Sequence, residues 1–212
     1  SKVISNSRKV SRVHFTDSEF NPYSTINIPK EDILGWPPTL LFYQPELETI
    51  IRTNKRKYKK LRIFENTELI KIENTNPIRL NIRNNREDSS IYCKYLVGCD
   101  GANSFVRKYI KARLIDFGFD QNWIVIYDHT TKKLYIYKDE VKQICDPNRL
   151  KTYVPGRRNH ERFEFKLLKG ESEKDFTLKK VWELLSPWIN RNNSRIERAV
   201  VYKFHACIAD KW

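Results

Sequence analysis

The fold is decided by the stretch YLVGCDGANSFVRKYI, residues 95–110, in which an apolar run stops at Asp100-Gly101 and a helical pattern follows. Gly98 and Gly101 carry no Cβ, so the backbone here can turn sharply and approach another group closely. The stretch therefore predicts a strand, a tight turn and a short helix over residues 102–112, in that order.

Polar side chains gather in this predicted turn. Asn103 or Ser104 is the expected helix cap, because both side chains accept hydrogen bonds from backbone N–H groups. Asp100 can accept from backbone N–H groups or from a ribose hydroxyl, and Arg107, one helical turn past Ser104, can hold a phosphate or the Asp100 carboxylate. Residue chemistry alone favours an ordinary capped turn and leaves a ligand-binding turn as the alternative.

The segments on either side of this stretch are mostly strand-like. Ile78, Leu80 and Ile82 alternate with polar residues, which is the period of two that a half-buried strand shows. The polar tract 84–90 is typical of a hairpin loop. Strands are expected at residues 11–15, 24–28, 61–65, 67–73, 78–83, 90–98, 123–128, 133–138, 162–168 and 198–206.

Two further helices are expected. In the first, Pro45 takes the first helical position, which places Gln44 at or beside the N-cap, at the end of an apolar segment. The second covers residues 177–191 and is expected to kink or stop at Pro187. Strands outnumber helices and do not alternate strictly with them, so the expected fold class is α+β, a mixed α/β arrangement.

Several classes of site are not encoded in the sequence. Four cysteines without a CxxC pair argue against a disulfide framework or a zinc knuckle and favour a reducing cytosol. No run of about 18 apolar residues occurs, so no transmembrane helix is expected. None of the six glycines forms a GxGxxG or GxxxxGK pattern. The four histidines fit no nucleophile or metal-ligand spacing, so no catalytic residue is assigned and no metal is expected.

The chain is strongly basic, with a net charge of +14. Its densest basic run, residues 52–62, holds seven basic residues and is best interpreted as a solvated helix end and connection. A non-catalytic basic binding module for nucleic acid or anionic surfaces stays open as an alternative.

The segment RFEFK, residues 162–166, has the period of two of a strand. Phe163 and Phe165 then share one face. Core packing is the default reading for the pair, and an aromatic wall for a bound substrate is the alternative.

In the order of its features, the chain resembles a known family. Residues 98–107, GCDGANSFVR, meet every position of Gly-x-Asp-Gly-x-x-Ser-x-Val-Arg, the Asp-Gly motif of single-component FAD-dependent aromatic hydroxylases related to p-hydroxybenzoate hydroxylase. Residues 35–51, 145–172 and 200–212 resemble, in the same order, segments of the 3-(3-hydroxyphenyl)propionate hydroxylase branch. The resemblance covers about residues 30–212.

The resemblance implies a cytoplasmic monooxygenase that uses FAD, NADH or NADPH, and O₂ to hydroxylate a phenolic aromatic acid such as 3-(3-hydroxyphenyl)propionate. It implies neither a membrane nor a nucleic-acid partner, and it leaves a homodimer of the full-length protein open. The cofactor-binding residues that it implies are Gln44, Asp100, Gly101, Ser104 and Arg107. The implied parts are strands joining the substrate sheet (1–35), a partial FAD-binding domain (36–112), a mostly antiparallel substrate-binding sheet (113–206) and a return to the FAD domain (207–212).

The chain also departs from the family pattern. The family's N-terminal GxGxxG and its later Gly-Asp motif are absent, and the chain has no Met. We therefore expect an internal fragment that binds FAD weakly or not at all by itself. The family's PGE is KGE here, at residues 169–171. A related FAD hydroxylase acting on another aromatic or polyketide ring is a further alternative.

Overall fold

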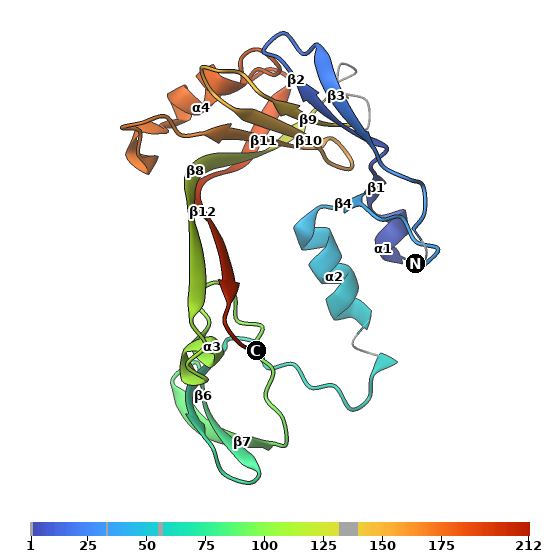
Figure 1. Ribbon diagram of the computed structural model, residues 1–212. Helices are drawn as coiled ribbons and strands as arrows, with labels where there is room; N and C mark the ends of the chain where they lie inside the picture. The colour runs from blue at the N-terminus through green and yellow to red at the C-terminus, as the bar shows by residue number, and fades with distance from the viewer. Residues whose placement is uncertain (1, 33, 55–56, 132–139) are drawn as a thin grey trace. The chain divides into compact units, whose positions relative to one another are not determined.

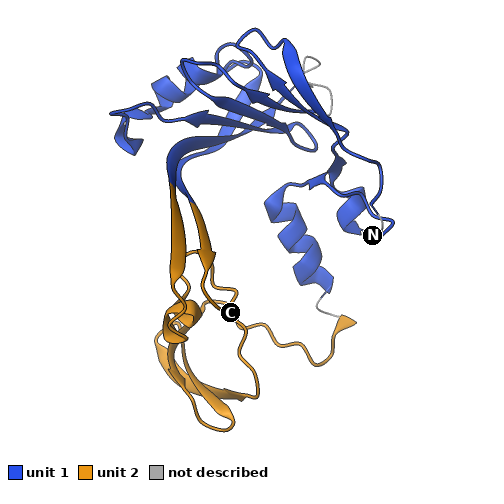
Figure 2. Ribbon diagram, viewed as in Figure 1, with its two compact units in different colours: residues 1–56, 119–205 blue, residues 57–118, 206–212 orange. Residues whose placement is uncertain are grey.

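The computed structural model describes residues 2–32, 34–54, 57–131 and 140–212. The chain forms two compact units (Figure 2), residues 1–56 with 119–205 and residues 57–118 with 206–212. We expected residues 36–56 in the FAD-binding part, whereas in the structure they cluster with the large sheet. The division of the chain into cofactor-binding and substrate-binding parts stays a prediction.

The larger unit is built on a seven-stranded sheet in the order β12-β8-β11-β10-β9-β2-β3 (Figure 1). The strands are β2 (Arg12–Thr16), β3 (Pro22–Asn27), β8 (Leu114–Thr130), β9 (Val141–Ile144), β10 (Lys151–Pro155), β11 (His160–Lys166) and β12 (Ser194–Ala209). β2 pairs in parallel with β9, whereas β2–β3, β9–β10, β10–β11 and β8–β11 are antiparallel. With few helices beside this sheet, the predicted mixed α/β class is confirmed. The strand expected at 133–138 lies outside the described residues.

The core of the larger unit lies between one face of this sheet and the helix α4 (Leu178–Leu185). β11 alternates half-buried and buried residues along its whole length, because successive side chains of a strand point to opposite faces. Phe163 and Phe165 lie on the buried face and pack with Leu185 and Trp188. The predicted helix stop is confirmed, since α4 ends directly before its C-cap Ser186 and Pro187.

Short elements complete the larger unit: α1 (Lys2–Ser5), β1 (Arg8–Lys9), β4 (Leu40–Leu41), α2 (Gln44–Asn54) and the 3₁₀ turn η3 (Glu173–Asp175). β1 and β4 pair antiparallel. α2 begins at Gln44, one residue before the first helical position predicted at Pro45. Pro45 still lies in the first turn, where the N–H that proline lacks would have no partner within the helix. None of its residues is buried.

The smaller unit contains a three-stranded antiparallel sheet and one short helix. Its elements are β5 (Thr67–Glu73), β6 (Ile78–Asn84), β7 (Glu87–Cys93) and α3 (Phe105–Tyr109). Leu80 and Ile82 are buried, as the alternation predicted. The loop between β6 and β7 is shorter than expected, because Asn85 and Arg86 make the turn at positive φ and the ladder resumes at once.

Of the strand predictions in this unit, one was wrong and another was wrong in extent. Residues 61–65 form no strand, and β7 stops at Cys93 although the apolar pattern continued to residue 98. Tyr95 and Val97 are 86% and 80% exposed, so this extension has no face to bury within its unit. Apolar composition alone does not make a strand where no neighbouring strand pairs with it.

The basic run 52–62 begins in the last turn of α2, and its residues 57–62 are exposed, while residues 55–56 lie outside the described part. No helix in the described part of the chain is both long and apolar enough to cross a membrane.

Candidate functional site

The larger unit contains a cavity of about 670 Å³. One wall comes from residues 40–48, which lead from β4 into the first turn of α2, and the other comes from the sheet and the turn after β10. A volume of this size falls in the range of small-molecule sites, about 300–1,000 Å³. The lining residues are Leu40, Leu41, Phe42, Tyr43, Gln44, Pro45, Glu48, Tyr127, Val154, Pro155, Gly156, His160, Glu161, Arg162, Glu197 and Arg198.

The strand register defines which face of the sheet lines this cavity. Arg162 on β11 is paired with Tyr127 on β8 and with Val154 on β10, so these three side chains share one face. All three line the cavity. Phe163, the next residue along β11, lies on the core face instead. One sheet therefore presents an apolar face to α4 and a mixed face to the cavity.

Phe163 and Phe165, the residues considered for an aromatic substrate wall, lie in the core. Each is 1% exposed, and their ring centroids lie 5.5 and 5.7 Å from that of Trp188. Neither residue lines the cavity. This placement favours the core-packing reading, because α4 covers the face that the two rings share.

Gln44 is a predicted cofactor-binding residue, and it lies on the cavity wall. Its side-chain amide Nε2 donates to Glu48 Oε1 at 3.0 Å, one helical turn along α2. The carbonyl oxygen of Tyr43 accepts from the backbone N–H groups of Glu46 and Leu47, each at 3.1 Å, which fixes the start of the helix. The helix start therefore sets the position of the Gln44 amide.

An aromatic and charged cluster surrounds His160 in the same cavity. The ring of Tyr43 stacks on that of His160, with centroids 3.9 Å apart and an interplanar angle of 11°. His160 Nδ1 lies 3.2 Å from Glu197 Oε2, and the ring of His129 lies 4.8 Å from that of His160. Burial and the nearby Glu197 carboxylate raise the pKa of Tyr43, so its hydroxyl keeps its proton at neutral pH.

Sequence reasoning missed His160 and Glu197 as site residues. His160 falls two residues before Arg162, so the period of two placed both on one face. The position of Glu197 could not be inferred, because it depends on β12 lying at the edge of the sheet next to β8. The period of two shows which residues of one strand share a face of the sheet, whereas the order of the strands decides which residues of different strands come together.

Positive charge is also present in the cavity wall. Arg162 Nε lies 2.9 Å from Glu164 Oε1, and the Arg162 side chain keeps 39% of its surface exposed. The guanidinium carbon of Arg198 lies 5.8 Å from the ring centroid of Tyr202. Both arginines are lining residues of the cavity, and arginine is the residue best suited to hold a carboxylate through two parallel hydrogen bonds.

The predicted turn residues Asp100, Gly101, Ser104 and Arg107 come together in the smaller unit. The Ser104 hydroxyl donates to Asp100 Oδ1, and the backbone N–H groups of Phe105 and Val106 donate to Oδ2 at 2.6 and 3.1 Å. Gly101 has a φ of +80°, a conformation that favours glycine.

Ser104 is confirmed as the helix N-cap, since its Oγ accepts from the Arg107 N–H at 3.0 Å. The Arg107 guanidinium Nη2 donates to the Ala102 carbonyl oxygen at 2.8 Å. Hydrogen bonds from Ser104 and from backbone N–H groups lower the pKa of Asp100, so this exposed carboxyl is ionised at neutral pH. The geometry is that of a capped turn, and Gln44 belongs to the other unit.

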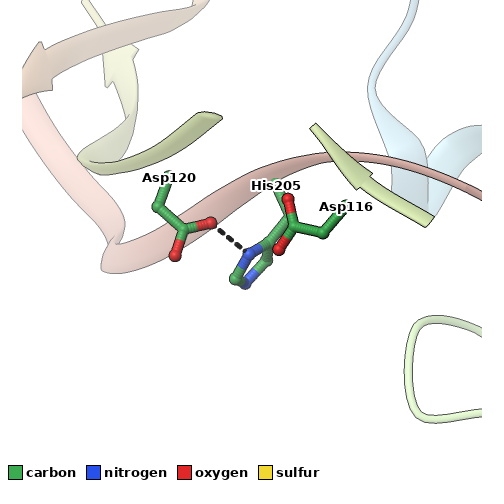
Figure 3. Close-up of side chains that lie close together, drawn as sticks. All are labelled: Asp116, Asp120 and His205. Atoms are coloured by element: carbon green, nitrogen blue, oxygen red, sulfur yellow. Dashed lines mark hydrogen bonds and ion pairs between the residues drawn. The ribbon is translucent and has the colours of Figure 1, made fainter. Parts of the chain in front are cut away.

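His205 on β12 forms an exposed pair with Asp120. Its Nδ1 lies 2.6 Å from Asp120 Oδ1 (Figure 3), and both side chains are 44% exposed. Asp120 also pairs with Lys203 at 2.7 Å. None of these three residues lines the cavity. His205 and Asp120 therefore form a histidine–carboxylate pair outside the cavity, whereas His160 and Glu197 form one inside it.

A family model described as "FAD binding domain" matches residues 12–205, most of the chain. The chain belongs to this FAD-binding domain family. The match covers both the cavity and the Asp100 turn.

Curated relatives are similar to the same region. A probable NADH-specific resorcinol 4-hydroxylase of Rhodococcus jostii (strain RHA1) is 26% identical over 182 residues, which cover 84% of this chain and 34% of the relative. A 3-(3-hydroxy-phenyl)propionate/3-hydroxycinnamic acid hydroxylase of Escherichia coli (strain SMS-3-5 / SECEC) is 25% identical over 194 residues, 87% of this chain and 33% of the relative. The chain thus spans about a third of the length of these relatives.

Solved structures share the fold. The p-nitrophenol 4-monooxygenase PnpA of Pseudomonas putida DLL-E4 has a TM-score of 0.83 at 14% identity, covering 99% of this chain and 54% of that one. Aklavinone-11 hydroxylase, in a ternary complex with FAD and aklavinone, has a TM-score of 0.77 at 17% identity, covering 98% of this chain and 43% of that one. The predicted resemblance to FAD-dependent aromatic hydroxylases is confirmed.

Membership of the FAD-binding domain family raises the question of which residues could touch FAD. Asp100 Oδ1 accepts a hydrogen bond from the Ser104 hydroxyl, and the carboxylate is exposed, so it keeps acceptor capacity for a ribose hydroxyl. The Gln44 amide lines the cavity and carries both a donor and an acceptor for a flavin ring edge. These residues fit contacts with parts of FAD, whereas no glycine-rich phosphate loop is present in the chain.

Proposed function

We propose that this chain is part of an FAD-dependent, NAD(P)H-using monooxygenase that hydroxylates a phenolic aromatic acid such as 3-(3-hydroxyphenyl)propionate. The cavity between residues 40–48 and the sheet is the observation that carries the proposal. Its lining combines apolar and aromatic residues with two arginines, which matches a ligand that has an aromatic ring and a carboxylate. The similar hydroxylases are named for phenols, which supports a phenolic ring, and the one named for 3-(3-hydroxy-phenyl)propionate acts on a phenol that also carries a carboxylate.

The cavity walls suit an aromatic ring. Leu40, Phe42 and Val154 are lining residues whose side chains offer no hydrogen bond to water, so a ring bound among them displaces water at little cost. Tyr127 and Tyr43 add aromatic surface on which a second ring can pack with offset or edge-to-face geometry. These walls exclude water from the ring once it is bound.

Arg162 is the group that we expect to bind the carboxylate of the substrate. Its ionic contact with Glu164 uses Nε, so this contact leaves the two terminal nitrogen atoms Nη1 and Nη2 to other partners. A substrate carboxylate can therefore pair with the remaining guanidinium N–H groups. Binding at this edge sets the orientation of the ring in the cavity.

Gln44, Asp100, Gly101, Ser104 and Arg107 are proposed to contact FAD. When bound, FAD supplies the redox chemistry that activates O₂ for attack on the ring. The part of this chain in the reaction is to hold the ring, exclude water and provide proton acceptors and donors at the cavity wall.

Calorimetric titration of residues 1–212 with 3-(3-hydroxyphenyl)propionate tests the substrate class. We expect saturable binding that weakens about tenfold or more in Arg162→Met, since the carboxylate loses a charged partner. Arg83→Met, which removes an exposed arginine of the smaller unit, is the matched control and should bind like the unsubstituted chain. Absence of binding to the unsubstituted chain, or equal binding by Arg162→Met, contradicts the proposal.

A further inference from the structure

The cavity holds a histidine–carboxylate pair that the proposed function has not used. His160 lies at the start of β11 and Glu197 lies on β12, and both line the cavity. His160 Nδ1 and Glu197 Oε2 are 3.2 Å apart, with side chains that are 21% and 29% exposed. The pair is thus partly shielded from solvent, yet it remains open to a ligand.

The chemistry of the pair fixes the protonation of the ring. An ionised carboxylate only accepts hydrogen bonds, so the neutral imidazole must carry its hydrogen on Nδ1 to donate to Glu197. Nε2 then carries a lone pair, and it has no hydrogen-bond partner within the described residues. Nε2 is therefore the nitrogen that can accept a proton from a ligand.

The packing around His160 holds the ring in one orientation. The Tyr43 ring stacks on one face of the His160 ring at a centroid distance of 3.9 Å. The hydrogen bond to Glu197 restricts rotation of the His160 ring about its side-chain bonds. Other titratable or charged groups line the cavity or lie on the elements that form it. These are Tyr43 and Glu48 from residues 40–48, Glu46 of α2 paired with Arg158, His129 from β8, Glu161 and Arg162 from β11, and Arg198 from β12.

We propose that His160 is a catalytic residue that accepts the hydroxyl proton of a phenol bound in this cavity, and that Glu197 positions it; the proposal rests on the proposed function. The phenol O–H bond breaks and an Nε2–H bond forms, while the electron pair stays on the phenolic oxygen. The products are a phenolate and an imidazolium paired with Glu197. A phenolate ring is more electron-rich than a phenol, which favours attack by an electrophilic oxygen.

The proposal is distinct from a structural role for the histidine. A ring that only packed against Tyr43 would be replaceable by another aromatic ring of similar size. His160→Phe keeps a ring for that stack and removes both nitrogen atoms, so it separates packing from proton transfer. His160→Gln is a second variant that keeps a polar side chain if the phenylalanine disturbs the fold.

The test uses residues 1–212 and the chromophoric phenol 3-(3-hydroxy-4-nitrophenyl)propionate, whose ionised form absorbs visible light. Absorbance of the bound phenol against pH gives its ionisation midpoint. We expect the midpoint of the bound phenol to lie about one pH unit below that of the free phenol, because a nearby cation favours the anion. His160→Phe and His160→Gln should move it back to the value of the free phenol.

Two controls show whether the effect belongs to His160. His205→Gln removes a histidine with a similar carboxylate contact outside the cavity (Figure 3) and should leave the midpoint unchanged. His129→Gln removes the neighbouring ring. If the shift is lost in His129→Gln and kept in the His160 variants, or if no variant changes it, the proposal is overturned.

The role of Glu197 has its own readout. Nitrogen-15 chemical shifts of the His160 ring report which nitrogen carries the hydrogen. We expect the Nδ1–H tautomer in the unsubstituted chain and a mixture of tautomers in Glu197→Gln, and an unchanged tautomer would overturn the positioning role. Failure of the calorimetric titration with 3-(3-hydroxyphenyl)propionate removes the proposed function, whereas intact binding with an unshifted midpoint removes only the role of His160.

Discussion

Glu161 on β11 and Asp128 on β8 are direct cross-strand partners, and both carboxyl groups are buried, with exposed fractions of 5% and 0%. The Tyr153 hydroxyl donates to Glu161 Oε2 at 2.7 Å, whereas neither carboxylate oxygen of Asp128 has a hydrogen-bond partner in the described part of the chain. Burial raises the pKa of Glu161 from 4.5 to about 7 and that of Asp128 from 3.8 to about 6.

These raised pKa values predict that the larger unit loses stability as the pH rises. Between pH 4.5 and about 7 the folded state binds more protons than the unfolded state, so the free energy of unfolding falls through this range. Glu161→Gln keeps an acceptor for the Tyr153 hydroxyl and removes the buried charge. We expect it to raise the unfolding free energy at pH 8 by about 1–3 kcal/mol and to leave it nearly unchanged at pH 4.

Urea unfolding at pH 4 and pH 8 measures this effect. Glu183→Gln, a change at an exposed position of α4, is the control for loss of a carboxylate and should alter stability by less than about 0.5 kcal/mol at either pH. Equal effects of Glu161→Gln at the two pH values would show that Glu161 does not retain a proton in the folded chain.

A side chain at position 101 should destabilise the chain through backbone conformation and not through a clash. Its φ is +80°, and a Cβ added there meets no atom within 4 Å. Gly101→Ala should therefore destabilise the smaller unit by about 1–2 kcal/mol through the left-handed conformation alone. Gly101→Asn should lose less stability than Gly101→Ala, because asparagine tolerates the left-handed conformation better.

Gly98 gives the contrasting case. A Cβ at this position would lie 2.7 Å from Val106 Cβ, so Gly98→Ala should cost more than Gly101→Ala even though Gly98 has no positive φ. Amide hydrogen exchange in α3 is the measurement. Faster exchange in Gly101→Ala than in Gly98→Ala would contradict the order expected from these contacts.

The capping of α3 predicts a local loss of stability. Ser104→Ala removes the acceptor for the Arg107 N–H and the donor to Asp100 Oδ1. We expect a cost of about 0.5–2 kcal/mol, and Ser104→Thr should recover much of it because threonine also caps helices. Ser89→Ala, on β7 of the same unit, serves as the control. An unchanged exchange rate at the amides of α3 in Ser104→Ala would contradict the cap.

The features of the fold that could be predicted from the sequence are those set by residues close together in the chain. The Ser104 cap, the start of α2 beside Pro45 and the stop before Pro187 follow from chemistry within one helical turn, and all three were predicted to within one residue. The alternation of Phe163 and Phe165 predicted their shared face. It could not show that α4 covers this face.

The cavity was the least predictable feature. His160 and Glu197 are 37 residues apart in the sequence, and they meet because β11 and β12 lie on either side of β8. Tyr43 reaches them from a segment before α2. The periodicity of the sequence could not predict that these three residues lie together, because the strand order arises from the packing of the whole unit.

The pair Arg149–Glu171 predicts a large loss of stability when Arg149 is replaced. Arg149 Nη1 and Nη2 donate to Glu171 Oε2 and Oε1 at 2.8 and 2.6 Å, and the side chains are only 11% and 20% exposed. Arg149→Met leaves a shielded carboxylate without its cation, so we expect a cost of about 2–4 kcal/mol. Arg83→Met breaks the exposed two-point contact with Asp88 and should cost much less than Arg149→Met, because solvent screens an exposed ion pair.

The same pair predicts an effect of pH. The hydrogen bonds from Arg149 are the largest cause of the lowered pKa of Glu171, so this carboxylate stabilises the fold above its ordinary pKa, and the stabilisation is lost as the pH falls through the lowered value. Between pH 7 and pH 2 the unfolding free energy should therefore fall less steeply with decreasing pH in Arg149→Met than in the unsubstituted chain. Equal slopes in the two chains would mean that Arg149 does not lower the pKa of Glu171.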